Sequence, residues 1–192
     1  MNAETIDTAN RAPAIDRTKQ RQLRDYYAIR AAVAGAWVVA AFTIGASVPV
    51  AAAILMVAYP AWDAAANLID AARNGGLARN PTQAINVAAS TLTAVAVLAV
   101  IGDTALVLRV FGAWAILAGL MQLATGARRW KAYGAQWAMI LSGAQSALAG
   151  GFFIAQSLGH VGSAIATVAG YAGFGAFYFL VSALWLTFRR SA

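Results

Sequence analysis

The stretch VPVAAAILMVAYPAWDAAANLIDAARNGG (residues 48–76) indicates the fold class of this protein. Its first part is an apolar run, and a helix needs about 20 mostly apolar residues to cross a bilayer. The helical pattern continues without a break into a part that carries Asp63, Asn67 and Asp70, and it ends at a pair of glycines. The stretch therefore predicts a transmembrane helix with polar side chains in its second half.

The composition of the whole chain agrees with a membrane protein. Of its 192 residues, 61% are hydrophobic and 11% are charged, whereas a soluble domain carries about 25% charged residues. The chain has no cysteine and one histidine, so disulfides, thiol chemistry and metal sites built from cysteine or histidine are excluded. We therefore expect an all-α integral membrane protein that contacts the lipid bilayer and needs no cofactor.

Six apolar runs are long enough to be transmembrane helices. They cover roughly residues 31–48, 50–71, 84–101, 104–125, 133–156 and 163–188. Residues 1–30 are polar and lack the apolar core and cleavage site of a signal peptide, so we expect a cytosolic tail that could form a helix at the membrane surface. The chain is thus predicted to divide into this tail and a six-helix membrane domain, residues 31–190.

The positions of the basic residues predict how the chain is threaded. With the N-terminus in the cytosol, every lysine and arginine except Arg109 lies in the tail or at a cytosolic loop or end, as the positive-inside rule requires. Outside the tail these residues are Arg73, Arg79, Arg128, Arg129, Lys131, Arg189 and Arg190. Both termini are therefore expected in the cytosol. The net charge of +7 is attributed to topology and lipid headgroups, and no nucleic-acid partner is expected.

The second, fourth and sixth predicted helices share a pattern. Each contains an aromatic residue, then Pro or Gly, then Ala, then a second aromatic residue, starting at Tyr59, Phe111 and Phe174, and each ends in arginine. We interpret this as three tandem two-helix hairpins. Because each hairpin crosses the membrane twice, these would be parallel repeats about an axis along the membrane normal.

Together these features resemble the HdeD family of bacterial acid-resistance membrane proteins, which includes many members with only a repeat domain of unknown function. The resemblance rests on six short helices, weak hairpin repeats and abundant glycine, and on the segments YPAWDAAANLIDAARNGG and NPTQAINVAAS. It covers roughly residues 30–190. It implies a small protein of the bacterial cytoplasmic membrane that is related to stress, and it supplies no catalytic residues.

Asp63, Asn67 and Asp70 fall on one helix face, within about 60° of one another. A charged group inside the bilayer is costly, so Asp63 is expected to face the bundle interior or a wet cavity. One reading is a cytosol-facing polar vestibule in which Asp63 binds a proton or a cation. The other is structural: Asp70 pairs with Arg73, and Asp63 hydrogen-bonds a neighbouring helix. The candidate partners of Asp63 are Ser90, Thr91, Gln122 and Gln145.

Other polar and small residues each allow two readings. The amides Gln122 and Gln145 could line the same cavity as Asp63 or only cross-link helices. His160, in the short loop SLGHVG, could sense acid outside the cell or be an ordinary solvated side chain. A set of small residues could pack helices within one chain or form a homodimer face. These small residues are Gly143, Ala147, Gly151, Gly170 and Gly173.

The sequence leaves three functions open. Phosphate-binding loops, nucleophile motifs and zinc-protease motifs are absent, and the outer loops are short, so an enzyme is not expected. The favoured hypothesis is a structural or stress-related membrane protein that acts by helix packing, oligomerisation or partner binding. The second is a small channel or transporter for protons or cations that uses Asp63. The third is a membrane subunit whose basic inner loops dock a larger complex.

Overall fold

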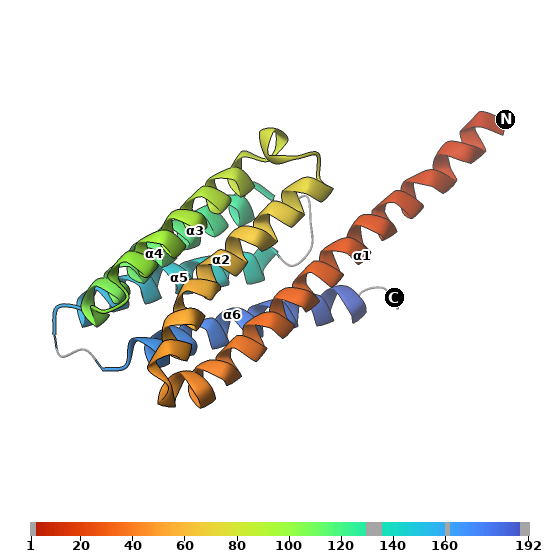
Figure 1. The fold of residues 1–192 in the computed structure, drawn as a ribbon. Coiled ribbons are helices and arrows are strands. Elements are labelled where there is room, and N and C mark those ends of the chain that lie inside the picture. Colours follow the sequence, from red (N-terminus) through yellow and green to blue (C-terminus); the bar gives the residue numbers. More distant parts are fainter. Residues whose placement is uncertain (1–2, 130–135, 160–161, 189–192) are drawn as a thin grey trace.

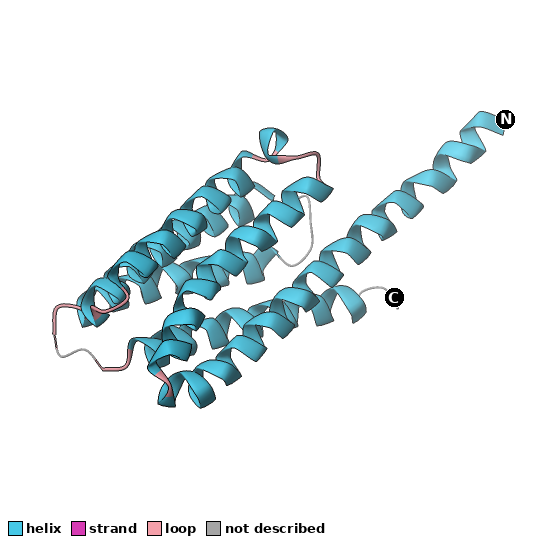
Figure 2. Ribbon diagram, viewed as in Figure 1, coloured by secondary structure: helices cyan, strands magenta, loops and turns pink. Residues whose placement is uncertain are grey.

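The computed structural model describes residues 3–129, 136–159 and 162–188. This part of the chain contains only helices, which lie side by side in a bundle (Figure 2). The long helices are α1 (Ala3–Ala40), α2 (Pro49–Arg73), α3 (Pro81–Val100), α4 (Thr104–Arg129), α5 (Gln136–Gln156) and α6 (Ala164–Phe188). A short π-helix, η1 (Ala41–Gly45), extends α1, and a 3₁₀ turn, η2 (Leu77–Arg79), precedes α3. The all-α prediction is confirmed.

The helices have the character of membrane spans. Among the described residues, five segments are long and apolar enough to cross a bilayer: Arg21–Gly45, α2, α3, α6 and most of α4. Large apolar side chains cover the outer faces of these segments; Leu92, Val50 and Phe188 are 69%, 69% and 71% exposed. Such a surface is suited to lipid and unfavourable in water. The fold is therefore that of a multi-pass membrane protein.

Local sequence signals explain where α2 begins and ends. Pro49 is at its first position, where no backbone N–H is needed. At the other end Gly75 and Gly76 have φ values of 95° and 85°, which only glycine adopts without strain. Pro81 then begins α3. The predicted limits of this helix agree with the structure to within two residues.

Helix α1 differs from its prediction. We expected a boundary near residue 30 between a polar tail and the first span, but one helix runs from Ala3 to Ala40 (Figure 1). No glycine or proline occurs between residues 14 and 34 to interrupt it. The part of this helix that is apolar enough to cross a bilayer lies within Arg21–Gly45, a range that includes Arg30, so no helix boundary separates Arg30 from the first span.

The helices pack in different pairs from the predicted hairpins. The most extensive contacts join α4 with α5, α1 with α6, and α2 with α3, whereas α1 touches α2 and α5 touches α6 much less. The turn at residues 46–48 joins α1 to α2, and the turn at residues 101–103 joins α3 to α4. The helices of each of these two pairs are therefore not each other's main packing partners. The threefold repeat itself stays a prediction.

Glycines bring α4 and α5 into backbone contact. A Cβ atom at Gly119 would lie 2.5 Å from the carbonyl oxygen of Gly143, and one at Gly150 would lie 2.4 Å from that of Gly112. Real Cβ atoms do not approach so closely, so these positions require glycine. Gly143 lies at a helix contact, as predicted, and so does Ala147, whose backbone nitrogen would be 2.6 Å from a Cβ at Gly119.

The rest of the predicted small-residue set does not pack against another helix. An added Cβ at Gly151, Gly170 or Gly173 meets nothing within 4 Å. On α5 the close contact follows Gly143, Ala147 and Gly150, and Gly151 is about 100° further round the helix. The packing role predicted for Gly151, Gly170 and Gly173 within one chain is wrong.

The two halves of the bundle are packed differently. We call the end where α2 and α4 finish, near Arg73, Arg79 and Arg128, the basic end; the turns at residues 46–48 and 101–103 form the far end. The apolar core gathers in the half next to the far end. It includes Trp37, Met56, Val97, Leu108, Phe111, Phe153 and Val168. The half next to the basic end holds the polar side chains and the cavities described below.

Candidate functional site

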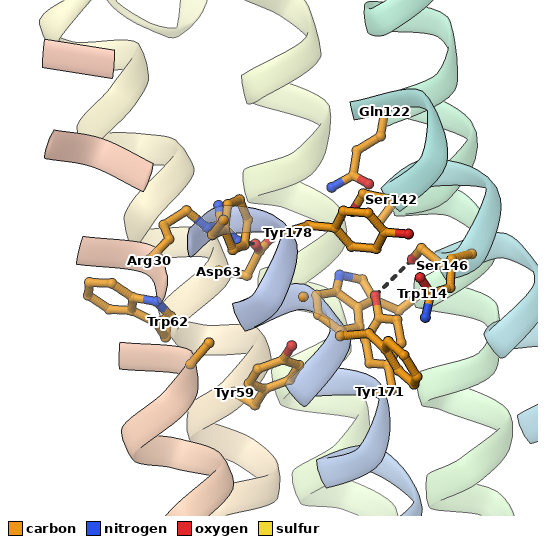
Figure 3. Close-up of a pocket in the computed structure, with 16 residues that line it drawn as sticks. Arg30, Tyr59, Trp62, Asp63, Trp114, Gln122, Ser142, Ser146, Tyr171 and Tyr178 are labelled. Atoms are coloured by element: carbon orange, nitrogen blue, oxygen red, sulfur yellow. Dashed lines mark hydrogen bonds and ion pairs between the residues drawn. The ribbon is translucent and has the colours of Figure 1, made fainter. Parts of the chain in front are cut away.

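The centre of the site is an ion pair between helices. Asp63 on α2 pairs through its Oδ1 atom with the guanidinium of Arg30 on α1 (Figure 3). Both side chains are largely buried, 16% and 14% exposed. The other carboxylate oxygen of Asp63, Oδ2, accepts hydrogen bonds from Ser90 Oγ at 2.8 Å and Asn67 Nδ2 at 3.1 Å. Both oxygens of the carboxylate are therefore occupied.

Arg30 connects three helices. Its Nη1 atom donates a hydrogen bond to the Tyr26 hydroxyl at 3.0 Å. Its guanidinium carbon lies 4.5 Å from the centre of the Phe179 ring on α6, a cation–π distance. Its Nε atom is buried and has no hydrogen-bond partner among the described residues. The cation is thus held in place but keeps one donor unused.

The network extends to a fourth helix through Ser90. This serine on α3 is fully buried, and its oxygen accepts a hydrogen bond from Trp114 Nε1 on α4 at 3.0 Å. Of the four partners considered for Asp63, Ser90 is confirmed; Thr91, Gln122 and Gln145 do not bond it. Asn67, predicted to share the face of Asp63, also donates to the backbone oxygen of Asp63 at 2.8 Å.

Asp70 has a different environment from the one expected. Its carboxylate accepts hydrogen bonds from Gln83 Nε2 at 3.0 Å and Asn74 Nδ2 at 3.1 Å. In the described ranges the ion pairs are Arg24–Asp25 and Arg30–Asp63, so the predicted pair with Arg73 is wrong. The amide of Gln83, on the first turn of α3, reaches Asp70 across the loop, while Arg73 is exposed at the helix end.

Two cavities meet at the ion pair. The cavity nearer the basic end, which we call the vestibule, has a volume of about 140 Å³ and is lined in part by Tyr26, Asp70 and Asn86. The other, which we call the inner cavity, has a volume of about 70 Å³ and lies deeper in the bundle. Both are large enough for several water molecules. The residues that border both are Arg30, Asp63, Ala118, Gln122 and Phe179.

The two predicted amides both reach this region. Gln122 borders both cavities, and its buried Oε1 atom has no hydrogen-bond partner within the part of the chain that the structure describes. Gln145 borders the inner cavity. Of the two readings for these amides, the shared cavity with Asp63 is therefore the correct one.

Aromatic side chains form a large part of the wall of the inner cavity. Tyr59, Trp62, Trp114 and Tyr178 come from α2, α4 and α6 (Figure 3). On the side of the far end, Tyr59 contacts Trp37 at 4.7 Å and Trp114 at 5.8 Å between ring centres. These rings join the apolar core, so the inner cavity ends there.

Sequence reasoning missed Arg30. The signal was present, because an arginine between Tyr26 and the apolar run could belong to the span itself. We assigned it to the tail since the first span was placed from residue 31. A first span that included Arg30 would have put this cation in the membrane together with the carboxylate of Asp63, and such groups pair with one another.

Some of the residues that the sequence singled out lie outside the part of the chain that the structure describes. His160, Lys131, Arg189 and Arg190 lie outside the described residues. Arg128 and Arg129 are the last two residues of α4, at the basic end.

Comparison of the chain with protein-family models, curated proteins and solved structures finds no match. The resemblance to the HdeD family therefore stays a prediction.

Proposed function

We propose that this protein is a small membrane transporter that binds a polar solute beside the Arg30–Asp63 pair. The observation that carries the proposal is a buried ion pair that borders two cavities, beside buried atoms of Arg30 and Gln122 that have no hydrogen-bond partner among the described residues. Ionisable groups inside a membrane are expensive, and they commonly mark the paths of ions and substrates. Packing alone would favour filling this space with apolar side chains.

The difference between the halves of the bundle supports a transporter over an open channel. The half next to the far end is closed by the aromatic and apolar core. The half next to the basic end contains the vestibule, which leads to the ion pair. A site near the middle of the bundle that is approached from one side fits one state of an alternating-access cycle. If the basic end is cytosolic, as the positive-inside rule predicts, this state faces the cytosol.

Because the chain has no cysteine, access to the site can be tested with single cysteine variants. Ala118→Cys places a thiol beside both cavities. In liposomes, a membrane-impermeant maleimide should label it rapidly from the side of the basic end and slowly from the other side. Asn86→Cys in the vestibule should be labelled from the basic side only. Val97→Cys, in the fully buried core, should stay unlabelled. If the Ala118→Cys variant is labelled from neither side, the transporter proposal is refuted.

A structural role is the second candidate, and the complete hydrogen bonding of Asp63 favours it. In that case the ion pair only joins α1, α2 and α3, and the protein acts by helix packing, oligomerisation or partner binding, as the HdeD resemblance implies. Asp63→Asn would then lower thermal stability, and Ala118→Cys would remain inaccessible. These outcomes differ from those of the transporter, so the same set of variants separates the two.

A further inference from the structure

We propose that the solute is a small organic monocarboxylate, which binds Arg30 while Asp63 takes up a proton. This inference rests on the proposed function, because it assumes that the cavities form a solute site. In this view the solute is an anion, the ion that accompanies it is a proton, and Asp63 is not a binding site for other cations.

The charges of the pair decide the sign of the solute. The empty site has no net charge, because one guanidinium faces one carboxylate. Arginine stays protonated in proteins, whereas a carboxylate can accept a proton. An added cation would leave an uncompensated positive charge that nothing in the pair can remove. An added anion can be compensated by protonation of Asp63, so the buried site stays neutral.

The unused hydrogen-bonding atoms point to the same class. Asp63 Oδ2 already accepts two hydrogen bonds, so an ammonium group would find an acceptor position only at Oδ1, beside the Arg30 cation, which repels it. Arg30 has an unused Nε donor, which is suited to a carboxylate oxygen. Gln122 has an unused Oε1 acceptor at the border of the same cavities, which is suited to a hydroxyl donor. The preferred solute is therefore a carboxylate with a hydroxyl group.

The cavity limits the size of the solute. The inner cavity has about 70 Å³ and aromatic walls that include Tyr59, Trp62 and Trp114. These walls favour an apolar carbon body, and the space admits a molecule of a few non-hydrogen atoms. A short-chain hydroxy acid such as lactate meets these requirements.

The exchange at the site can be written without a change in net charge. The solute carboxylate takes the place of Asp63 Oδ1 at the guanidinium. Asp63 accepts one proton at Oδ1 from the aqueous phase at the basic end, by way of the vestibule, and Ser90 and Asn67 continue to donate to Oδ2. One anion and one proton therefore enter together, and release reverses both steps.

Other ionisable groups near Asp63 are few. On α1 they are Arg30, Tyr26 and Tyr27, on α2 Asp70 and Tyr59, and on α6 Tyr171 and Tyr178. The side chains that α3, α4 and α5 place in the cavity walls are amides, hydroxyls, Trp114 and apolar groups. Asp63 is thus the carboxylate in direct contact with Arg30.

Calorimetric titration of the full-length protein in lipid nanodiscs tests the proposal. The probes are lactate, its deoxy counterpart propionate, and propylammonium as a cation. Titration in two buffers with different heats of ionisation gives the number of protons taken up. We expect lactate to bind with uptake of about one proton per anion near neutral pH. Propionate should bind more weakly, and propylammonium should not bind.

Three variants separate the possible outcomes. Arg30→Gln should weaken lactate binding by about 100-fold. Asp63→Asn should bind lactate at least as tightly as the wild type, with no proton uptake, because Arg30 is then unpaired. Arg24→Gln, which removes an exposed arginine outside the cavities, should behave as the wild type. Folding of each variant is checked by size exclusion and thermal unfolding; if Asp63→Asn does not fold, Asp63→Ser is used instead.

Failure of this inference is distinguishable from failure of the proposed function. Binding of propylammonium that Asp63→Asn abolishes would establish a cation site and overturn the anion proposal. Lactate binding without proton uptake would overturn the coupling. Labelling of Ala118→Cys from both sides, without binding of lactate or propionate, would keep the transporter and reject the solute class. Absence of that labelling would reject the transporter itself.

Discussion

At the scale of single residues, the buried ion pair between Arg30 and Asp63 is the centre of the candidate site. Each charge alone would be buried without compensation, while together they are hydrogen-bonded to Tyr26, Ser90 and Asn67. Removing one partner of a buried pair is far more harmful than removing both, because the remaining charge is left unpaired.

Arg30→Gln should therefore lower the free energy of unfolding by about 3–5 kcal/mol. The double change Arg30→Gln with Asp63→Asn should recover most of that loss, because no charge then remains buried. Thermal unfolding in detergent measures both. The neighbouring exposed pair gives the control: Arg24→Gln should change stability by less than about 1 kcal/mol. A double variant as unstable as the single one would contradict the argument.

The sequence revealed one half of this pair. Asp63 stood out because a carboxylate in an apolar helix needs a partner, and Ser90 was among the partners considered. Arg30 did not stand out, because a basic residue at the edge of a span is common. Whether such a residue turns inward depends on the packing of α1 against α6, which local sequence does not encode.

At the scale of elements, the closest contact in the bundle is between α4 and α5. The pairs Gly112–Gly150 and Gly119–Gly143 bring backbone atoms together along the two helices. This contact makes α4 and α5 the most closely packed pair of helices in the described bundle.

Substitution of neighbouring glycines on α5 tests this contact. Gly150→Ala places a methyl group 2.4 Å from a backbone oxygen, so we expect a loss of about 1–3 kcal/mol in stability. Gly151→Ala meets open space and should be neutral or stabilising by about 0.5–1 kcal/mol, because alanine favours a helix. Thermal unfolding of the two variants under the same conditions gives the comparison. Equal losses in both variants would show that the contact is absent.

Apart from the start of α1, the limits of the helices were predictable to within a few residues, but their pairing was not. Pro49, Pro81 and the glycines at 75 and 76 are strong local signals, and they fixed α2 and α3 closely. The pairing of helices depends on which of their faces fit one another. In a helix with many small residues, the sequence alone does not show which of them face the neighbouring helix. Gly143 was recognised, whereas Gly112, Gly119 and Gly150 were overlooked for this reason.

At the scale of the whole molecule, the arrangement of basic residues predicts the orientation in the membrane. The basic end carries Arg73 and Arg79 next to exposed Asn74, while the far end has the exposed Ser47. From the positive-inside rule we expect the basic end to lie in the cytosol.

Cysteine variants in the two connecting segments test this orientation. In intact cells, Ser47→Cys should react with a membrane-impermeant maleimide. Asn74→Cys should react only after the membrane is permeabilised. The cysteine-free parent serves as the blank. The reverse labelling pattern would place the basic end outside and the vestibule with it.

The uneven packing of the two halves also has a consequence for the volume of the protein. One half is filled by interlocking rings, and the other encloses two cavities. Dense interiors resist compression, whereas void space is eliminated when hydrostatic pressure rises. Pressure should therefore affect the two halves differently. In the half next to the basic end the cavities should collapse or fill with water first, while the packing of the far half stays unchanged.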